Sequence, residues 1–292
     1  MKDAIVVKNI CKHYKDFSLD HVSFRVPQGS IVGFVGENGA GKSTSIRAIL
    51  DLITLDGGSV EVLGLDQEER KDPAWREQIG VVFDVGHLPE LMTAAEIDRI
   101  MAGIYKQWDS QKYFGYLKQF KLSRDKKYKE FSRGMKMKLS LAVAMSHGAK
   151  LLVLDEHTGG LDPIVRDEIL DIFLDYIQEE DHSILISSHI ISDLEKVADY
   201  IVFIHEGQVC LQEETGKLLE QYGIVRTTSE QADQLMADPC MANQVVGRRD
   251  SRFHCEIMVR DRDEICNRYP DLVVDSAGIE EIMLYTIKGA RS

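Results

Sequence analysis

Short apolar runs alternate with amphipathic stretches in the first part of the chain, and this pattern predicts a parallel β-sheet covered by helices. The apolar runs at 30–35, 151–154 and 183–187 are typical of buried strands. Between the last two runs, apolar residues recur at helical spacing: Ile169, Ile172, Phe173, Tyr176 and Ile177. After the first run, Ile46, Ile49, Leu50 and Ile53 also fall at helical spacing. Alternating strands and helices favour an α/β fold with a parallel sheet.

Strand patterns disappear between about Pro89 and Lys150, where the chain is predicted to be helical. Thr93-Ala-Ala-Glu96 has the form of a capping box that opens a helix. The apolar stripe expected for this helix is Ile97, Ile100, Met101, Ile104, Tyr105 and Trp108, and a second stripe is Phe114, Leu117 and Phe120. We therefore expect a helical subdomain, at about 86–150, inserted into the α/β core.

The last part of the chain has a different character. Residues 200–209 predict a β-hairpin with its turn near Glu206-Gly207. From about 222 the elements are weaker, with an apolar segment at 253–259 and a final helical pattern that ends near Ile287. We expect a main domain at 1–221 and a small α+β domain at 222–292. That small domain could regulate, bind a ligand or cap a dimer, and its sequence does not choose among these roles.

Composition narrows the class of protein. The 292 residues are 44% hydrophobic and 28% charged, which is ordinary for a globular protein. The net charge of −13 argues against nucleic acid as a partner. The five cysteines are scattered without CxxC spacing, so they indicate free thiols in a reducing compartment rather than a disulfide framework or a zinc knuckle. No signal peptide or membrane-spanning run is visible.

A glycine-rich segment follows the first strand and carries the clearest chemistry. It has the spacing of a phosphate-binding loop and consists of Gly36, Glu37, Asn38, Gly39, Ala40, Gly41, Lys42, Ser43 and Thr44. Glycines let backbone N–H groups converge on phosphate oxygens, and the following helix offers its positive end. Lys42 should reach the β and γ phosphates, and Ser43 should ligate Mg²⁺. The segment predicts binding of a nucleotide, ATP, with Mg²⁺.

Two carboxylates, Asp155 and Glu156, end the buried run at 151–154. Beside a phosphate loop, Asp155 would hold Mg²⁺ and its hydration shell, and Glu156 would polarise the attacking water. On its own, this pair could equally be a strand that leaves the core at acidic loop residues. Together with the phosphate loop it favours ATP hydrolysis.

With these elements the chain, over residues 1 to about 215, resembles the ATP-binding subunits of ABC transporters. Phe131-Ser132-Arg133-Gly134-Met135 is similar to the signature of that family, which binds the γ-phosphate held by the opposite subunit. Ser132 and Gly134 match, Arg133 replaces a glycine, and Met135 replaces a glutamine. Similar versions occur in the exporter branch. The resemblance implies a P-loop NTPase fold of ABC type with an N-terminal antiparallel β part.

Three further positions take their roles from the resemblance. Asp162 in Gly160-Leu161-Asp162 is similar to the D-loop aspartate, and His189 is similar to the switch histidine that contacts the γ-phosphate. Tyr14 is similar to the aromatic residue that stacks on adenine. The family usually has glutamine where this chain has Asp84, and it usually has another type of residue where His157 follows Glu156. A carboxylate at Asp84 could still ligate Mg²⁺.

The resemblance implies two such subunits, identical or closely related, that clamp ATP between phosphate loop and signature and drive separate integral membrane subunits. The chain would then be cytoplasmic and peripheral on the inner face of the cell membrane. The closing segment at 278–289 resembles the ends of antibiotic and peptide exporter subunits. The alternatives are a soluble ABC-type ATPase that acts on a macromolecular assembly, and a small-molecule kinase. The chain has no second nucleotide unit, long coiled-coil insertion or basic face that would favour the former.

Overall fold

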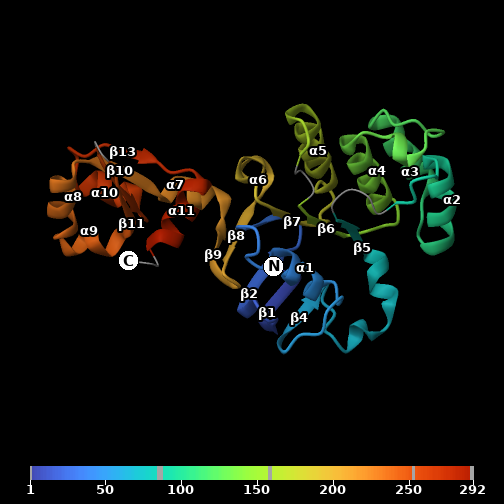
Figure 1. Cartoon of the computed structure of the whole chain (residues 1–292), viewed down its shortest axis with the longest axis horizontal. Helices are drawn as coiled ribbons and strands as arrows, with labels where there is room; N and C mark the ends of the chain where they lie inside the picture. The colour runs from blue at the N-terminus through green and yellow to red at the C-terminus, as the bar shows by residue number, and fades with distance from the viewer. Residues whose placement is uncertain (1, 84–87, 157–159, 252–253, 290–292) are drawn as a thin grey trace. The chain divides into compact units, whose positions relative to one another are not determined.

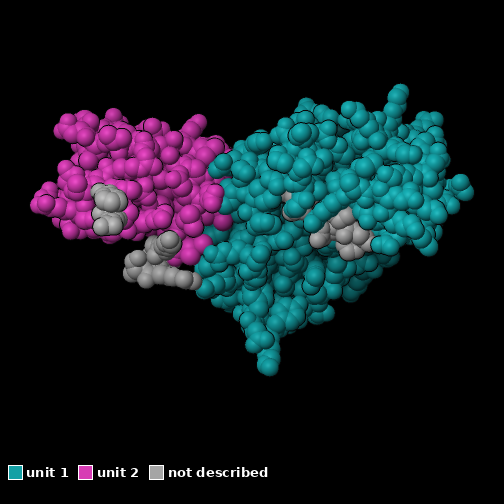
Figure 2. Space-filling view, turned by 45° about the horizontal axis from the view of Figure 1, so that its top comes forward, with its two compact units in different colours: residues 1–212 teal, residues 213–292 magenta. Residues whose placement is uncertain are grey.

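A computed structural model of the chain describes residues 2–83, 88–156, 160–251 and 254–289. These residues form two compact units, 1–212 and 213–292 (Figure 2). The division lies earlier in the chain than the boundary after residue 221 that the sequence suggests. The reason is that α7 (Thr215–Gln221) contacts α10 (Arg262–Arg268) and α11 (Ile279–Gly289), which belong to the second unit.

The first unit is built on a six-stranded sheet in the order β5-β6-β7-β3-β8-β9 (Figure 1). Its strands are β3 (Ile31–Val35), β5 (Ile79–Val82), β6 (Leu151–Asp155), β7 (Ser183–Ser188), β8 (Tyr200–His205) and β9 (Gln208–Glu214). The pairs β3–β7, β3–β8, β5–β6 and β6–β7 are parallel. Every residue of β3 and β7 is buried, as expected for central strands of a sheet covered on both faces. The predicted parallel sheet is confirmed.

A three-stranded antiparallel sheet, ordered β2-β1-β4, stands beside this core. It consists of β1 (Asp3–His13), β2 (Ser18–Pro27) and β4 (Gly57–Val62). Phe24 of β2 stacks on Phe34 of β3 with ring centroids 4.9 Å apart, and both side chains lie in one apolar core with residues of α1 (Lys42–Ile49). This shared core holds the phosphate loop between the two sheets.

The helices of the first unit include a group, α2–α4, that Figure 1 shows together beyond β5. They are α2 (Ala94–Ile104), α3 (Ser110–Gln119) and α4 (Arg133–Met145), and the remaining helices are α5 (Pro163–Tyr176) and α6 (Ile191–Val197). Thr93 and Glu96 form the predicted capping box: Thr93 accepts from the Glu96 amide, and Glu96 accepts from the Thr93 amide. Short 3-10 turns occur at Glu69–Lys71, Pro73–Gln78 and Tyr128–Glu130.

Two helix predictions were too long. Helix α1 ends at Ile49 because Asp51 takes a left-handed conformation, with φ of +57°, so Ile53 lies outside it. Helix α2 ends at Ile104, which is 61% exposed, so the predicted stripe does not continue into the core. Trp108 lies beyond that helix and donates from its indole nitrogen to Asp98.

The second unit has a four-stranded antiparallel sheet ordered β11-β12-β10-β13. Its elements, besides α7, α10 and α11, are β10 (Gly223–Thr227), β11 (Val245–Asp250), β12 (Cys255–Val259), β13 (Val274–Ser276), α8 (Ser229–Met236) and α9 (Pro239–Gln244). The final helix predicted from the sequence is confirmed as α11. Among the residues that the structure describes, no helix in either unit has the length and apolar character that a membrane span requires.

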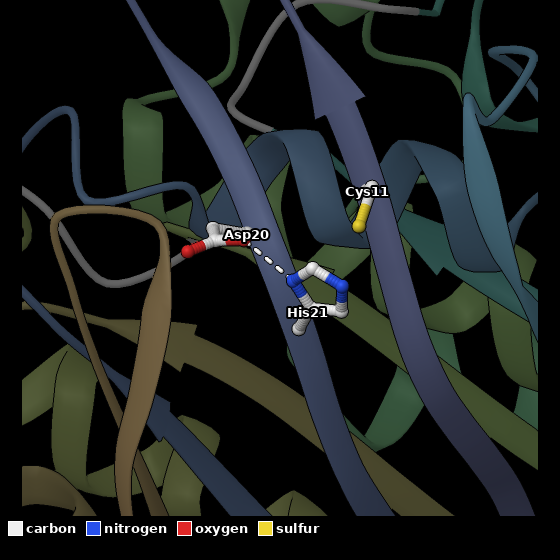
Figure 3. Close-up of side chains that lie close together, drawn as sticks. All are labelled: Cys11, Asp20 and His21. Atoms are coloured by element: carbon white, nitrogen blue, oxygen red, sulfur yellow. Dashed lines mark hydrogen bonds and ion pairs between the residues drawn. The ribbon is translucent and has the colours of Figure 1, made fainter.

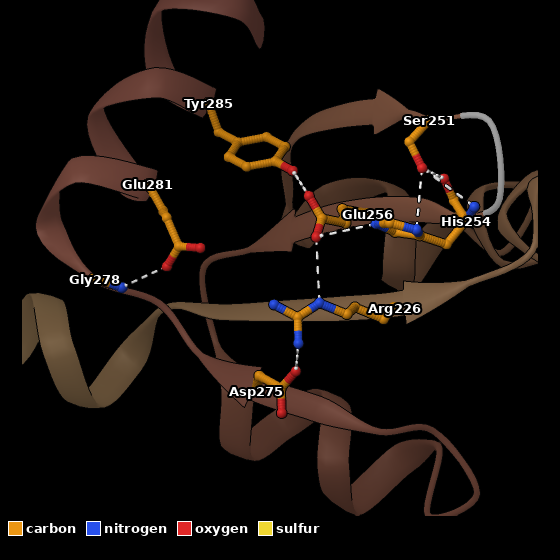
Figure 4. Close-up of polar contacts among 8 residues, drawn as sticks. All are labelled: Arg226, Ser251, His254, Glu256, Asp275, Gly278, Glu281 and Tyr285. Carbon is orange, nitrogen blue, oxygen red and sulfur yellow. Dashed lines mark hydrogen bonds and ion pairs between the residues drawn. The ribbon is translucent and has the colours of Figure 1, made fainter.

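The Glu256 carboxylate is the centre of a polar network in this second unit (Figure 4). Glu256 of β12 accepts hydrogen bonds from Arg226 Nε at 3.2 Å and from the Tyr285 hydroxyl at 3.0 Å, and Arg226 also pairs with Asp275. Desolvation opposes ionisation of Glu256, but the hydrogen bonds from Tyr285 and Arg226 prevail and lower its pKa. The network links β10, β12, β13 and α11.

The contact between β5 and β6 gives a test of packing in the first unit. A β-carbon at Gly80 would lie 2.5 Å from Leu152 Cδ2 and 2.6 Å from the Ala144 carbonyl oxygen, whereas one at Gly103 in α2 would meet no atom within 4 Å. We expect Gly80→Ala to lower the free energy of unfolding by about 1–3 kcal/mol. Gly103→Ala, the matched control, should leave it unchanged or raise it by up to ~1 kcal/mol. Urea unfolding of both variants measures this, and equal effects would contradict the packing at β5.

Candidate nucleotide-binding site

The phosphate loop connects β3 to α1, and its glycines are required by close approach of other atoms. Gly41 has φ of +114°, and a β-carbon there would lie 2.7 Å from Leu19 Cδ2. A β-carbon at Gly36 would lie 2.3 Å from the Ile204 carbonyl oxygen. The loop therefore packs directly on β2 and β8. A side chain at Gly36 would meet backbone, and one at Gly41 would require a backbone conformation that other residues rarely adopt.

Lys42 is the first residue of α1 and its side chain is buried. The ammonium donates to the carbonyl oxygens of Gly36, at 2.7 Å, and Glu37, at 3.0 Å. No acidic residue lies in the first turn of α1, so the positive end of the helix is not offset within that turn. This combination is suited to an anion such as a nucleotide phosphate.

The other loop residues differ in exposure. Ala40 is buried, whereas Ser43 and Thr44 are half-buried at the start of α1. The exposed residues are Glu37, Asn38 and Gly39. Gly207, in the turn between β8 and β9, donates its amide to the Ala40 carbonyl oxygen at 3.0 Å.

The two predicted carboxylates are held by a serine of the neighbouring strand. Ser187 of β7 donates to Asp155 Oδ1 at 2.6 Å. The Glu156 amide donates to the Ser187 carbonyl oxygen at 3.1 Å and lies 3.3 Å from the Ser187 hydroxyl. Glu156 has φ of +49°, which is uncommon for a residue other than glycine and occurs where surrounding contacts fix the backbone. Ser187, to which no sequence motif pointed, therefore orients the Asp155 carboxylate and holds the backbone of Glu156.

Glu156 brings together two of the predicted residues. Its Oε1 lies 3.5 Å from Lys42 Nζ, and its Oε2 lies 4.0 Å from His189 Nδ1. Lys42 comes from the loop after β3, Glu156 from the end of β6, and His189 from the end of β7. The carboxyl ends of three neighbouring parallel strands thus meet at one edge of the sheet, where a ligand of an open α/β sheet normally binds.

The signature-like segment begins α4. The Ser132 hydroxyl accepts from the Met135 amide at 3.3 Å and caps the helix. A β-carbon at Gly134 would lie 2.6 Å from Val165 Cγ1, and one at Gly160 would lie 2.7 Å from an Arg133 guanidinium nitrogen. These contacts hold the segment beside the start of α5.

Asp162 caps α5. Its Oδ1 accepts from the Val165 amide at 3.0 Å. In the part of the chain that the structure describes, no hydrogen bond or ion pair joins Asp162, Ser132, Gly134 or Met135 to the phosphate loop. The predicted residues thus form two separate groups.

Tyr14 lies just past the end of β1 and its side chain is 49% exposed. The segment before it is anchored by Asp56, which accepts from the His13 amide at 2.7 Å and from Lys12 Nζ at 3.2 Å. The hydrogen bonds from His13 and Lys12 lower the Asp56 pKa to about 2, so this carboxylate stays ionised at neutral pH. No local sequence pattern points to Asp56, because it lies in a loop far from Tyr14 along the chain. Asp84 and His157 lie outside the described residues.

Comparisons with known proteins agree with this geometry. The family model described as "ABC transporter" matches residues 19–159. The bacitracin transport ATP-binding protein BcrA of Bacillus licheniformis is 36% identical over 213 residues, which cover 72% of this chain and 69% of that protein. The chain belongs to the ABC transporter family.

Two further proteins that are similar to this ABC transporter chain match 71% and 74% of its length. The lantibiotic transport ATP-binding protein SrtF of Streptococcus pyogenes is 33% identical over 211 residues, 71% of this chain and 90% of that protein. A solved structure of an ATP-binding subunit of an ABC transporter has a TM-score of 0.66 and 27% identity, and covers 74% of this chain and 91% of its own. The family resemblance and the ABC-type fold predicted from the sequence are therefore confirmed. The chain is an ATP-binding and ATP-hydrolysing subunit, not a small-molecule kinase.

The position of Ser187 in this ABC subunit gives a test of its role as a positioning residue. We expect Ser187→Ala to lower the kcat for ATP hydrolysis about tenfold with little change in KM, because one hydrogen bond that orients the Asp155 carboxylate is lost. Ser183 is equally buried on β7 but lies at the opposite end, where its hydroxyl accepts from the Gly29 amide. Ser183→Ala is the control and should keep kcat within about twofold. Equal losses in both variants would indicate a general effect on the strand.

Proposed function

We propose that two copies of this subunit, or this subunit and a close relative, clamp ATP and power export through separate integral membrane subunits. The observation that supports the clamp is the separation of the predicted residues into two groups. Lys42, Glu156 and His189 gather at the sheet edge, whereas Ser132, Gly134 and Met135 sit at the start of α4 without a bond to them. The start of α4 carries the positive end of the helix dipole, which suits it to a phosphate bound by another subunit.

Within one subunit, the roles follow from position and charge. Lys42 neutralises charge on the β and γ phosphates, and Glu156 accepts a proton from, or orients, the attacking water. His189 holds the γ-phosphate from the other side of Glu156. Tyr14, on its exposed strand end, stacks on adenine. Arg133 adds a positive charge to the signature helix start, and Asp162 fixes the beginning of α5 beside it.

The residues at the sheet edge also fit Mg²⁺, the cation that ATPases of this type use. Hard cations prefer oxygen ligands, and Asp155 and Ser43 offer a carboxylate and a hydroxyl. Asp155 Oδ2 and the Ser43 hydroxyl have no hydrogen-bond partner within the described ranges. Mg²⁺ would be held by Ser43 and Asp155, with Asp84 as a further carboxylate ligand. When bound, it would neutralise charge on the phosphates.

Export of a peptide antibiotic is supported by the relatives, two of which are named for transport of bacitracin and of a lantibiotic. With membrane subunits as partners, the chain would be peripheral on the inner face of the cell membrane. The negative net charge gives no support to a nucleic-acid partner. The soluble, non-transport ATPase remains the alternative, and no specific observation favours it.

The Glu156→Gln variant tests the clamp. We expect ATP turnover to fall at least ~100-fold, because the group that activates water is lost, while ATP binding is kept. ATP should then hold the variant as a dimer, measured by size-exclusion chromatography with light scattering. Glu179→Gln, at an exposed position after α5, is the matched control and should behave as the parent. A Glu156→Gln variant that binds ATP but stays monomeric would contradict the clamp.

A further inference from the structure

The β1–β2 hairpin brings together three side chains that can bind a metal ion: Cys11, Asp20 and His21 (Figure 3). One ligand atom from each side chain lies within 4.8 Å of the others. Cys11 is on β1, and Asp20 and His21 are consecutive residues of β2. These residues lie apart from the ATP-hydrolysing group of Lys42, Glu156 and His189 in the sequence and come from the other sheet.

Consecutive residues of a regular strand point to opposite faces, so the cluster needs a departure from regular pairing. Ile10 pairs with Val22, and Lys12 pairs with Leu19. Cys11 alone on β1 thus faces two residues on β2, which is a β-bulge. His21 has φ of +52°, a left-handed conformation that is uncommon for a non-glycine residue in a strand. The bulge places Asp20 and His21 beside the same thiol.

The histidine of this cluster is oriented by the carboxylate. His21 Nδ1 lies 2.6 Å from Asp20 Oδ1, and Gln208 Nε2 donates to Asp20 Oδ2 at 2.6 Å. Without metal, a carboxylate at Nδ1 favours a proton there and leaves the lone pair of Nε2 free for a metal ion.

We propose that Cys11, Asp20 and His21 form a binding site for Zn²⁺. The ligands are Cys11 Sγ, His21 Nε2 and an Asp20 carboxylate oxygen, with water in the fourth position. Three protein ligands of sulfur, nitrogen and oxygen type with one open position are a known zinc arrangement. To bind the same cation as His21 Nε2, the Asp20 carboxylate leaves His21 Nδ1 and turns toward the cation, and its second oxygen can keep the hydrogen bond from Gln208. Binding releases the thiol proton to solvent, since the thiolate is the ligand.

The fit needs rotation of the Asp20 and His21 side chains. Ligand atoms around tetrahedral Zn²⁺ are roughly 3.3–3.8 Å apart, given metal–ligand distances of about 2.0–2.3 Å. The present separations of up to 4.8 Å therefore have to close by about 1 Å. The side chains of His21 and Asp20 are 71% and 50% exposed, so both can rotate without displacing neighbours.

The proposed zinc site lies in the hairpin that carries Tyr14 and is linked to the phosphate loop. A cation bound to Cys11 and Asp20 would cross-link the two strands on either side of the segment that carries Tyr14. The Asp20 amide donates to the Gly207 carbonyl oxygen at 2.9 Å, and the Gly207 amide donates to the Ala40 carbonyl oxygen at 3.0 Å. The zinc site is thus connected by backbone hydrogen bonds to the phosphate loop. The zinc site itself does not depend on the proposed export function.

Titration of metal-free protein with Co²⁺, without nucleotide, tests the proposal. We expect one equivalent to produce the near-ultraviolet charge-transfer band of a cobalt thiolate, and Zn²⁺ to abolish it by displacement. Cys11→Ser should lose the band. Cys210→Ser, which changes an exposed cysteine on β9 outside the cluster, is the matched control and should keep it. Asp20→Asn and His21→Gln should weaken Co²⁺ binding at least ~10-fold.

Alkylation of the unchanged protein gives a second measurement that does not depend on how a variant folds. Zn²⁺ should slow the reaction of iodoacetamide with Cys11 at least tenfold, and it should leave the rate at Cys210 unchanged. Peptide mass spectrometry measures both rates in one sample. The proposal is overturned if the parent shows no cobalt thiolate band, if the band persists in Cys11→Ser, or if Zn²⁺ does not protect Cys11.

Discussion

A buried ammonium group needs acceptors around it, and the site of this protein is organised by how Lys42 obtains them. Two loop carbonyls and the Glu156 carboxylate surround its charge, because desolvating a cation without partners is costly. The loop can curl around Lys42 only because glycine stands at Gly36 and Gly41, against β8 and β2. The shape of the phosphate loop and the position of the Glu156 carboxylate are therefore linked through the Lys42 side chain.

The parallel sheet supplies the other half of this arrangement. Strands β6 and β7 run in the same direction as β3, so their carboxyl ends deliver Glu156 and His189 to the same edge as the loop. Hydrogen bonds from Ser187 to Asp155 and from the Glu156 amide to Ser187 connect the end of β6 to the end of β7. Strands β3 and β7 are buried along their whole length, and groups at the ends of such packed strands can be held at the short distances that phosphoryl transfer needs.

The antiparallel sheet contributes differently. Its bulge at Asp20-His21 and the Asp56 contacts to the end of β1 define both sides of the segment that carries Tyr14. Backbone hydrogen bonds through Gly207 connect this hairpin to the phosphate loop. Tyr14, the proposed contact to adenine, and the phosphate loop, the proposed contact to the phosphates, are thus connected through one set of backbone hydrogen bonds.

The sequence alone determined the features that depend on neighbours in the chain. Loop glycines, the apolar strands before Gly36 and Asp155, and the capping box at Thr93 are local, and they were predictable because short-range sterics and capping decide them. The family resemblance rested on the same spaced motifs. Pairing across the sheets was decided only by the tertiary structure: Ser187 reaches Asp155 across a strand, and Cys11 meets His21 through a bulge that no spacing rule reveals. Helix α2 ends at Ile104, and α7 packs with the second unit. Both features depend on which surfaces are covered by elements distant in the chain, and local sequence patterns carry no information on that.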